Sequence, residues 1–432
     1  MPQLSAAPVA PDRYANPAYR WYAVLVMMGV YLCHALDRSM AGILVEPIKA
    51  EFGLTDTQAG LYAGTGYGLA FAIFVVPMGL LSDRVNRRNL LAALVATWSI
   101  CTALGGFARN YGQLVVARMG VGAAEAGSAP LAMPMLSDIF PAGRRSFVVG
   151  IFYMSTNVGS VLASVAGGYI AAEHGWRTAL LVAGLPGLFF AVLLLLTVQE
   201  PRRGGAEQAG AEGLEKAASP REVARFLVRN PAVVALIVGC GLLSLLSVTF
   251  GAWSASFFIR AHGLSLAEAG LLLGLGGGAA GTCAPPIFGW LGDKLAARHG
   301  SWPLRLVWCG ALIAICAGMM MLFVPVLAVA ALGYAIGEFM RSGYPPTSFG
   351  VLMTQSPVRM RGAIMALVQF ASVFLGWGMG PLFIGLLSDL YGGGLGIRYA
   401  LANALLLYLP AAGLFLYAQW KMFPNNPARR SA

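Results

Sequence analysis

Apolar residues form continuous runs of about twenty positions along nearly the whole chain, separated by short polar or charged breaks. Such a run matches a helix that crosses the hydrocarbon core of a bilayer, whereas membrane-spanning β-strands give short segments of alternating polarity. The pattern therefore predicts an all-α membrane protein with about twelve transmembrane helices. We place them near 21–44, 58–80, 89–108, 113–136, 147–171, 176–198, from 232 onward, 266–291, 304–323, 326–352, 362–387 and 397–420.

One polar interruption is much longer than the others and divides the helices into two sets of six. Its part 204–219 is rich in Gly, Ala and Glu, which is typical of flexible linkers. In its second part Arg221, Arg225 and Arg229 recur every four residues, which predicts a short basic amphipathic helix on an anionic membrane surface. We therefore divide the chain into an N-terminal tail (1–20), a first six-helix bundle (21–198), a linker (199–231), a second six-helix bundle (232–420) and a C-terminal tail (421–432).

The two bundles share a sequence repeat. Residues 53–64 match 263–274 at an offset of 210, and at the same offset 79–84 fall on 289–294. Further matches occur at slightly larger offsets, as small loop insertions produce. A repeat of this kind predicts two pseudo-symmetric six-helix bundles with a central site between them, as in many secondary transporters.

Composition and charge support a membrane protein and place its termini. Of the residues 58% are hydrophobic and 11% are charged, against about 25% charged in a typical soluble domain. A net charge of +11 is compatible with nucleic-acid binding, but most of the 29 Lys and Arg residues fall on the side of the 79–88 loop. This asymmetry predicts an inner (cytoplasmic) membrane protein with both termini in the cytoplasm and no nucleic-acid partner. We expect a monomer, and the first twenty residues contain no apolar core of a signal peptide.

The sequence contains no recognisable catalytic or metal-binding pattern. The six cysteines lie in or near apolar runs without metal-ligand spacing, which indicates free thiols. We expect no cofactor, no metal site and no enzymatic activity. A membrane enzyme and a non-transporting membrane sensor are remote alternatives.

Charged residues inside the predicted spans are the main functional candidates, because a charge in hydrocarbon is costly and usually faces a cavity or a partner. The first span contains His34, Asp37 and Arg38. The fourth contains Arg118 and Glu125, which are two helical turns apart and share one face. The alternatives are that Asp37 and Arg38 reach lipid headgroups at the outer end, and that Arg118 and Glu125 form a purely structural pair.

The tenth span contains a second charged pair, Glu338 and Arg341, on one helix face. An offset of 216 places Glu125 opposite Arg341, whereas an offset of 210 places Asp37 opposite Ser247. The buried charge is therefore distributed unequally between the repeats, although a purely structural charge should repeat. We predict a charged cluster in the first bundle and a counterpart in the second, both facing a shared cavity.

The chemistry of these residues suggests proton coupling. Burial favours the neutral form of a carboxyl group, and a nearby arginine favours the charged form. We hypothesise that Asp37 or Glu125 is the proton site, that Arg38 or Arg118 is its exchangeable partner, and that protonation shifts the equilibrium between inward and outward states. His34 is either a proton relay or a packed structural histidine.

The predicted cavity wall combines aromatic residues with these charges, which suits an amphiphile that has an anionic head group. Aromatic residues at helical spacing also serve simply as packing. The predicted lining is Arg38, Arg118, Glu125, Tyr67, Phe71, Trp253, Glu338, Arg341, Tyr344 and Trp377.

Residues 79–88 resemble the signature loop of the major facilitator superfamily, Gly-x-x-x-Asp-Arg-x-x-Arg-Arg between the second and third helices. Residues 118–122 resemble a second signature of that superfamily, in which an arginine of the fourth helix is linked to proton coupling. The resemblance implies the major facilitator fold and a cytoplasmic gate motif. Its residues here are Gly79, Asp83, Arg84, Arg87, Arg88, Asp293 and Lys294.

The first-helix pair Asp37-Arg38, together with these signatures and Trp176-Arg177, resembles the spinster-like branch of the superfamily. That branch implies transport of lysophospholipids or sphingosine-phosphate-like lipids, often linked to protons. The chain departs from the family pattern at His34, where the family tends to have Asn, and at Asn86, where the loop usually has Gly. We therefore expect a proton-coupled, alternating-access transporter of a lipid-like substrate; a carrier of small organic anions and a multidrug exporter are the alternatives.

Overall fold

The computed structural model describes residues 13–82, 84–203 and 219–423, and every regular element within them is helical. Nine segments of this described part are long and apolar enough to cross a membrane. One of them, 148–197, contains both the fifth and the sixth predicted spans, because Gly175 (φ 81°) breaks the helix there. The fourth and tenth predicted spans form helices within 111–139 and 327–355. The prediction of an all-α, multi-pass membrane protein is confirmed.

The first bundle is built from residues up to Thr197. Its elements are η1 (Arg13–Ala15), α1 (Pro17–Ile43), α2 (Val45–Phe52), α3 (Asp56–Gly60), η2 (Leu61–Thr65), α4 (Gly66–Ser82), α5 (Arg87–Gly106), α6 (Tyr111–Glu125), α7 (Ser128–Ile139), α8 (Ala142–Leu162), η3 (Ala163–Gly167) and α9 (Gly168–Thr197). The prediction of a tail over 1–20 is wrong for its last residues. Helix α1 begins at Pro17 because the Asn16 side chain accepts a hydrogen bond from the backbone N–H of Ala18.

The second bundle follows the short linker helix α10 (Pro220–Arg229). Its elements are α11 (Pro231–His262), α12 (Leu266–Leu271), η4 (Leu272–Gly277), α13 (Gly278–Ala296), α14 (Trp302–Phe323), α15 (Leu327–Gln355), η5 (Val358–Met360), α16 (Arg361–Val373), η6 (Phe374–Met379), α17 (Gly380–Tyr391), α18 (Gly396–Leu406) and α19 (Tyr408–Met422).

The sequence repeat corresponds to a repeated turn. Gly53 and Gly263 both adopt the left-handed conformation, with φ 62° and 68°, at the end of a helix. Two residues later Thr55 and Ser265 each begin the next helix with a capping box. Glycine is favoured where φ is positive, and the capping box satisfies free N–H groups of the new helix. The same local chemistry therefore forms corresponding corners of the two bundles.

The bundles contact each other mainly where α3 packs against α17 and α12 packs against α9, and four π-helical segments lie next to these contacts. Segment η2 packs against η6, and η3 packs against η4. Small residues permit the close approach, since a Cβ atom on Gly60 would lie 2.4 Å from the carbonyl oxygen of Pro381. Likewise a Cβ atom on Gly270 would lie 2.2 Å from the carbonyl oxygen of Ser164. Gly60, Gly64 and Gly68 of the second span share one helix face, and a Cβ atom on any of them would lie within 2.6 Å of the second bundle.

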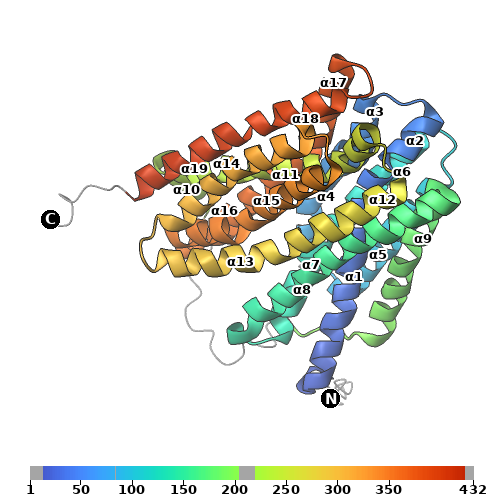
Figure 1. Ribbon diagram of the computed structural model, residues 1–432. Coiled ribbons are helices and arrows are strands. Elements are labelled where there is room, and N and C mark those ends of the chain that lie inside the picture. Colours follow the sequence, from blue (N-terminus) through green and yellow to red (C-terminus); the bar gives the residue numbers. More distant parts are fainter. Residues whose placement is uncertain (1–12, 83, 204–218, 424–432) are drawn as a thin grey trace, which may run out of the picture.

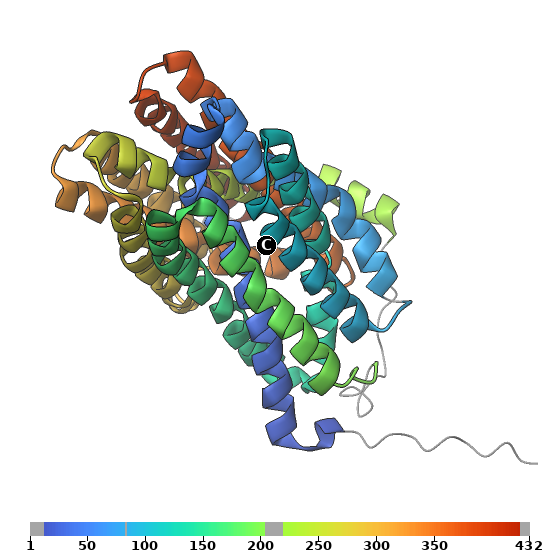
Figure 2. The same cartoon turned by 90° about the vertical axis from the view of Figure 1, so that its right-hand side faces the viewer.

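Figure 1 shows the two bundles converging at the end that contains α2, α3, α12 and α17 and diverging toward the opposite end. In the rotated view α17 again lies beside the short helices of the first bundle (Figure 2). One hydrophobic core continues across both bundles at the converging end, whereas a second core belongs to the first bundle alone. We call the converging end the closed end of the molecule.

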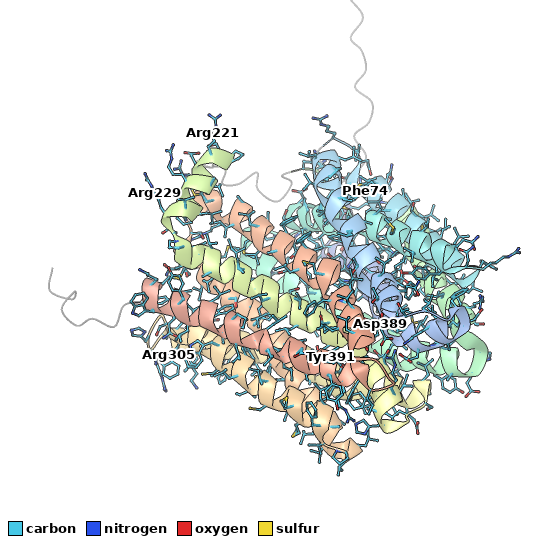
Figure 3. All side chains as sticks on the ribbon, turned by 90° about the horizontal axis from the view of Figure 1, so that it is seen from above. Phe74, Arg221, Arg229, Arg305, Asp389 and Tyr391 are labelled. Carbon is cyan, nitrogen blue, oxygen red and sulfur yellow. The ribbon has the colours of Figure 1, made fainter. Side chains whose placement is uncertain are left out.

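The linker helix α10 is amphipathic, as predicted, and part of its apolar face is covered by protein. Val223, Phe226 and Leu227 pack against the core of the second bundle. Arg221 and Arg229 are exposed and extend away from it (Figure 3). Helix α11 contacts α10. That α10 lies on an anionic membrane surface stays a prediction.

Candidate functional site

A cavity of about 460 Å³ lies between the two bundles. Its charged lining residues are Arg38 of α1 and the pair Glu338 and Arg341 of α15. Its polar wall consists of Ser39, Asn157, Ser160, Ser164, Ser244, Ser247 and Ser342. Its aromatic wall consists of Tyr334, Tyr344 and Trp377. Five predicted lining residues are therefore on this wall: Arg38, Glu338, Arg341, Tyr344 and Trp377.

The other five predicted lining residues lie behind the wall: Arg118, Glu125, Tyr67, Phe71 and Trp253. Phe71 packs on the core of the first bundle, and the fully buried Trp253 donates a hydrogen bond to the carbonyl oxygen of Pro381 at 3.0 Å. The prediction is corrected for these residues. Helical spacing predicts which residues share a face, but the docking of neighbouring helices decides which of them reach the cavity.

Glu125 is fully buried inside the first bundle. The Tyr67 hydroxyl donates a hydrogen bond of 2.7 Å to its Oε2 atom, and His34 Nδ1 lies 3.0 Å from the same oxygen. Helix α4 passes close enough to place Tyr67 there because residue 122 is glycine. A Cβ atom on Gly122 would lie 2.3 Å from the carbonyl oxygen of Tyr67. Glu125 therefore sits in a sealed site with two neutral or protonatable neighbours.

His34 connects this carboxyl group to the cavity wall. Its Nε2 atom lies 3.2 Å from Nη1 of Arg38, in a hydrogen bond. A guanidinium can only donate, so Nε2 is the acceptor in this contact, and Nδ1 is the ring nitrogen that faces Glu125. The Arg38 guanidinium lies 4.3 Å from the ring centroid of Trp377, a residue of the second bundle. We call Glu125, His34 and Arg38 the buried relay.

Arg118 and Asp37 are both buried, at 6% and 3% exposure, but they do not pair through the carboxylate. Arg118 donates from Nη1 to the backbone oxygen of Asp37 at 3.2 Å, and its guanidinium lies 4.7 Å from the Tyr67 ring centroid. No ion pair among the described residues joins Arg38 or Arg118 to Asp37 or Glu125. The structural Arg118–Glu125 pair is therefore not formed here, and Asp37 does not reach the lipid headgroups.

The counterpart in the second bundle is an ion pair on the cavity wall. Arg341 Nη2 lies 3.0 Å from Glu338 Oε2, and Ser342 donates to Glu338 Oε1 at 3.1 Å. The Arg341 guanidinium also lies 4.5 Å from the ring centroid of Phe250. The two charges hold each other in fixed positions at the edge of the cavity.

A second charged cluster closes the molecule at the closed end, and the sequence analysis missed it. Arg260 of α11 binds Glu46 at 2.6 Å and Asp56 at 2.8 Å, both in the first bundle. Asp389 of α17 accepts hydrogen bonds from the backbone N–H groups of Asp56 and Thr57 at 2.9 and 2.8 Å (labelled in Figure 3). These hydrogen bonds and ion pairs join the two bundles at this end. The only sequence signal was the isolated Arg260 at the end of the seventh span.

Beside this cluster, Trp176 and Arg177 bind Glu51 of α2 within the first bundle. The Trp176 indole donates at 2.7 Å and Arg177 Nη1 donates at 2.5 Å. The guanidinium of Arg177, followed by the indole N–H, lowers the pKa of the Glu51 carboxyl from its ordinary value. The contact fixes α2 against α9 without joining the two bundles.

The predicted cytoplasmic gate motif lies at the opposite, diverging end. Arg87 binds Asp138 at 2.6 Å and Glu200 at 2.7 Å, both in or just after the first bundle. Arg88 donates to Glu200 and to the carbonyl oxygens of Leu195 and Val198. Asp83 lies outside the described residues. None of the described contacts of these arginines reaches the second bundle.

The other described gate residues in each bundle also make no described contact with the opposite bundle. Arg84, Asp293 and Lys294 are exposed, and the Lys294 ammonium lies 4.8 Å from the ring centroid of its neighbour Trp290. A Cβ atom on Gly79 would meet no other atom within 4 Å, so no neighbouring helix approaches closely there. The described residues of the motif do not connect the bundles in this conformation, because the ends of the bundles have diverged.

A model of the Major Facilitator Superfamily matches residues 27–381. The chain belongs to the major facilitator superfamily. An "MFS-type efflux pump" from Mycolicibacterium smegmatis is 30% identical over 93% of this chain and 92% of its own length. "Protein spinster" of Drosophila melanogaster is 30% identical over 60% of this chain but only 42% of its own length.

Along most of its length, this chain is similar to a solved structure of a bacterial homologue of the human lysosomal transporter Spinster. That structure is in an inward-facing and unoccupied conformation and has a TM-score of 0.84 at 25% identity. The similarity covers 94% of this chain and 98% of the homologue. These findings confirm a spinster-like transporter of the superfamily, and the two-bundle fold.

Proposed function

We propose that this protein is a proton-coupled secondary transporter that moves an amphipathic, lipid-like solute with an anionic head group by alternating access. The observation that carries the proposal is the buried relay. It connects a fully buried carboxyl group to a guanidinium on the cavity wall, at 3.0 Å between Glu125 and His34 and 3.2 Å between His34 and Arg38.

Alternating access is supported by the unequal ends of the molecule. The bundles are joined by Arg260 and Asp389 at the closed end, whereas the described contacts of Arg87 and Arg88 at the diverging end lie in or just after the first bundle. The positive charge near residues 79–88 favours the cytoplasm at the diverging end. On this orientation the conformation is open to the cytoplasm and closed to the outside.

The coupling step follows from the hydrogen-bond roles in the buried relay. Nε2 of His34 cannot take a proton while it accepts from Arg38. An anionic head group in the cavity attracts Arg38 and frees that nitrogen. A proton then binds within the His34–Glu125 pair, so the interior of the bundle gains a positive charge or loses a negative one. Because Arg38 also stacks on Trp377, this change acts directly on a contact between the bundles.

The cavity fits a head group better than a whole lipid. Its 460 Å³ lies within the range of small-molecule sites. Arg38 and Arg341 provide cationic groups on opposite bundles, and serine hydroxyls supply further donors. We place the head group between the two arginines, with the acyl chain extending along the apolar side of Trp377 and toward the diverging end.

A second candidate function is the export of drugs or small organic anions. It is favoured by the serine-rich wall and by the efflux pump that resembles this chain over nearly its whole length. Here the same arginines bind a compact anion and no acyl chain occupies the space between the bundles.

Transport by purified protein in proteoliposomes tests the proposal. With an imposed pH gradient we expect movement of radiolabelled lysophosphatidylglycerol, and little movement of benzoate or of the cationic drug ethidium. Dissipating the gradient with a protonophore should remove accumulation. Gradient-driven movement of benzoate or ethidium without lysolipid movement would establish the second candidate, and lysolipid movement that ignores the protonophore would refute proton coupling.

A further inference from the structure

A second, much smaller cavity of about 20 Å³ lies inside the first bundle and shares no lining residue with the central cavity. Asp37 of α1, Thr102 of α5 and Arg118 of α6 contribute its polar lining. Thr102 is four residues before the end of α5 at Gly106, which is about 6 Å along the helix axis. The crevice is therefore in the part of the bundle nearest the closed end.

Three polar atoms in this crevice lack a hydrogen bond of normal geometry: Asp37 Oδ1, Thr102 Oγ1 and Arg118 Nε. The Thr102 hydroxyl nevertheless faces the Asp37 carboxyl group. Their residues are 3%, 6% and 6% exposed. Buried polar groups are normally paired with protein or ordered water, because an unpaired one is destabilising. The cavity volume suits a single water molecule, which needs roughly 10–15 Å³. A carboxylate oxygen, a hydroxyl and an N–H donor also match the bonds that one water makes.

The surrounding groups favour water over a metal cation. Arg118 brings a positive charge into the crevice. The other titratable or charged groups around Asp37 are Cys33, His34 and Arg38 on its own helix, Tyr62 of η2, Cys101 of α5 and Glu125 of α6. None of the described residues forms a cluster of ligands suited to a metal ion.

We propose that this crevice binds one water molecule between Asp37, Thr102 and Arg118, and that Asp37 exchanges its proton through it with solvent at the closed end. The inference rests on the proposed proton coupling, to which it adds a proton path separate from the substrate cavity. In the exchange step the water oxygen takes the carboxyl proton, the electron pair of the broken O–H bond stays on Asp37, and the resulting hydronium passes its proton to solvent.

Infrared spectroscopy of the purified full-length protein tests the path without requiring transport. The carboxyl stretching band of Asp37 is identified as the band that is missing in Asp37→Asn. At an acidic pH, the shift of this band is followed over time after the protein is transferred into D₂O. Thr102→Val removes the hydroxyl at nearly constant volume. Gly105→Ala narrows the crevice with ordinary contacts, since its Cβ atom would lie 3.4 Å from Leu180 Cδ1. We expect deuterium exchange to slow by about tenfold or more in Thr102→Val, as loss of a hydrogen bond to a charged group implies.

The controls separate the two routes. Gly413→Ala adds a methyl group in open space on α19 and should leave the exchange rate unchanged. Gly251→Trp or Ser247→Trp fills the central cavity and should also leave it unchanged. Slower exchange in the tryptophan variants, with wild-type exchange in Thr102→Val and Gly105→Ala, would overturn the inference. If deuterium exchange slows in the crevice variants but the protein shows no proton-driven transport, the proposed function would be overturned and the water-filled crevice would stand.

Discussion

Glu125 and Glu338 occupy related helices of the two repeats and have opposite surroundings. Glu125 is fully buried and contacts Tyr67 and His34, neither of which is a permanent cation. Glu338 lies on the cavity wall, where its side chain is 20% exposed and paired with Arg341. A permanent cation keeps a carboxyl group ionised, whereas a neutral partner allows it to change its protonation state. On the proposed mechanism, this difference assigns the proton site to the first bundle and fixed charge for the substrate to the second.

The largest effect that tests this difference is expected from Glu125→Gln. The substitution keeps the shape and hydrogen-bonding capacity of the side chain but removes its proton exchange. Gradient-driven uptake into proteoliposomes should fall to the level of protein-free liposomes, while exchange of labelled for unlabelled substrate without a gradient continues. Glu338→Gln is the matched control and should retain gradient-driven uptake, with weaker substrate binding. Equal loss of gradient-driven uptake in both variants would remove the distinction between the bundles.

Arg341→Lys sharpens the substrate side of the comparison. Lysine retains the charge but loses the planar guanidinium that contacts Glu338 and Phe250. Loss of a charge-assisted hydrogen bond to the head group should weaken binding about tenfold to a hundredfold. Titration calorimetry with a lysophospholipid measures the affinity. The pH dependence of transport should keep its wild-type midpoint, and a shifted midpoint would assign Arg341 to the proton site instead.

The closed end offers a third test, because one arginine there joins the bundles and another does not. Arg260→Gln removes the contacts with Glu46 and Asp56, whereas the matched Arg177→Gln removes a contact within the first bundle. A cysteine at position 57, in a background without the native cysteines, reports opening of this end through its labelling by a membrane-impermeant maleimide. Labelling should rise several-fold in Arg260→Gln only. A similar rise in Arg177→Gln would show general loosening.

The smallest expected effect concerns the pH dependence of stability at Glu51. Its pKa is lowered from the ordinary value of 4.5 by Arg177 and Trp176, so the contact stabilises the folded protein above pH 4.5 and is lost as the pH falls through the lowered value. Exposure limits the contribution to at most about 1 kcal/mol. Glu51→Gln should melt slightly below wild type at pH 7 and coincide with it at the most acidic pH the protein tolerates. An undiminished difference at acidic pH would contradict the assignment.

The features that could be predicted from the sequence are those that depend on local pattern. The spans followed from apolar runs, and the repeated corners followed from Gly-Leu-Thr and Gly-Leu-Ser, whose left-handed glycines and capping boxes are local structures. The Glu338–Arg341 pair followed from helical spacing. It was correct because both residues belong to the same helix face.

The features that could not be predicted depend on how helices dock. Arg118 and Glu125 share a face as expected, yet Arg118 binds backbone carbonyl oxygens of α1 while Glu125 meets Tyr67 and His34. Nothing in the spacing of α6 specifies these partners, because they come from other helices. The Arg260 cluster joins residues about two hundred positions apart, and only the packing of the two bundles brings them together.

The central claim is that the buried relay couples the substrate cavity to Glu125. The most direct test of this claim is to measure proton uptake when substrate binds. Purified protein in weakly buffered detergent solution is mixed with lysophosphatidylglycerol, and a pH indicator reports protons taken up. The account predicts uptake by wild type and none by Glu125→Gln at saturating ligand, with binding of the ligand verified by calorimetry. Wild-type proton uptake in Glu125→Gln would contradict the account.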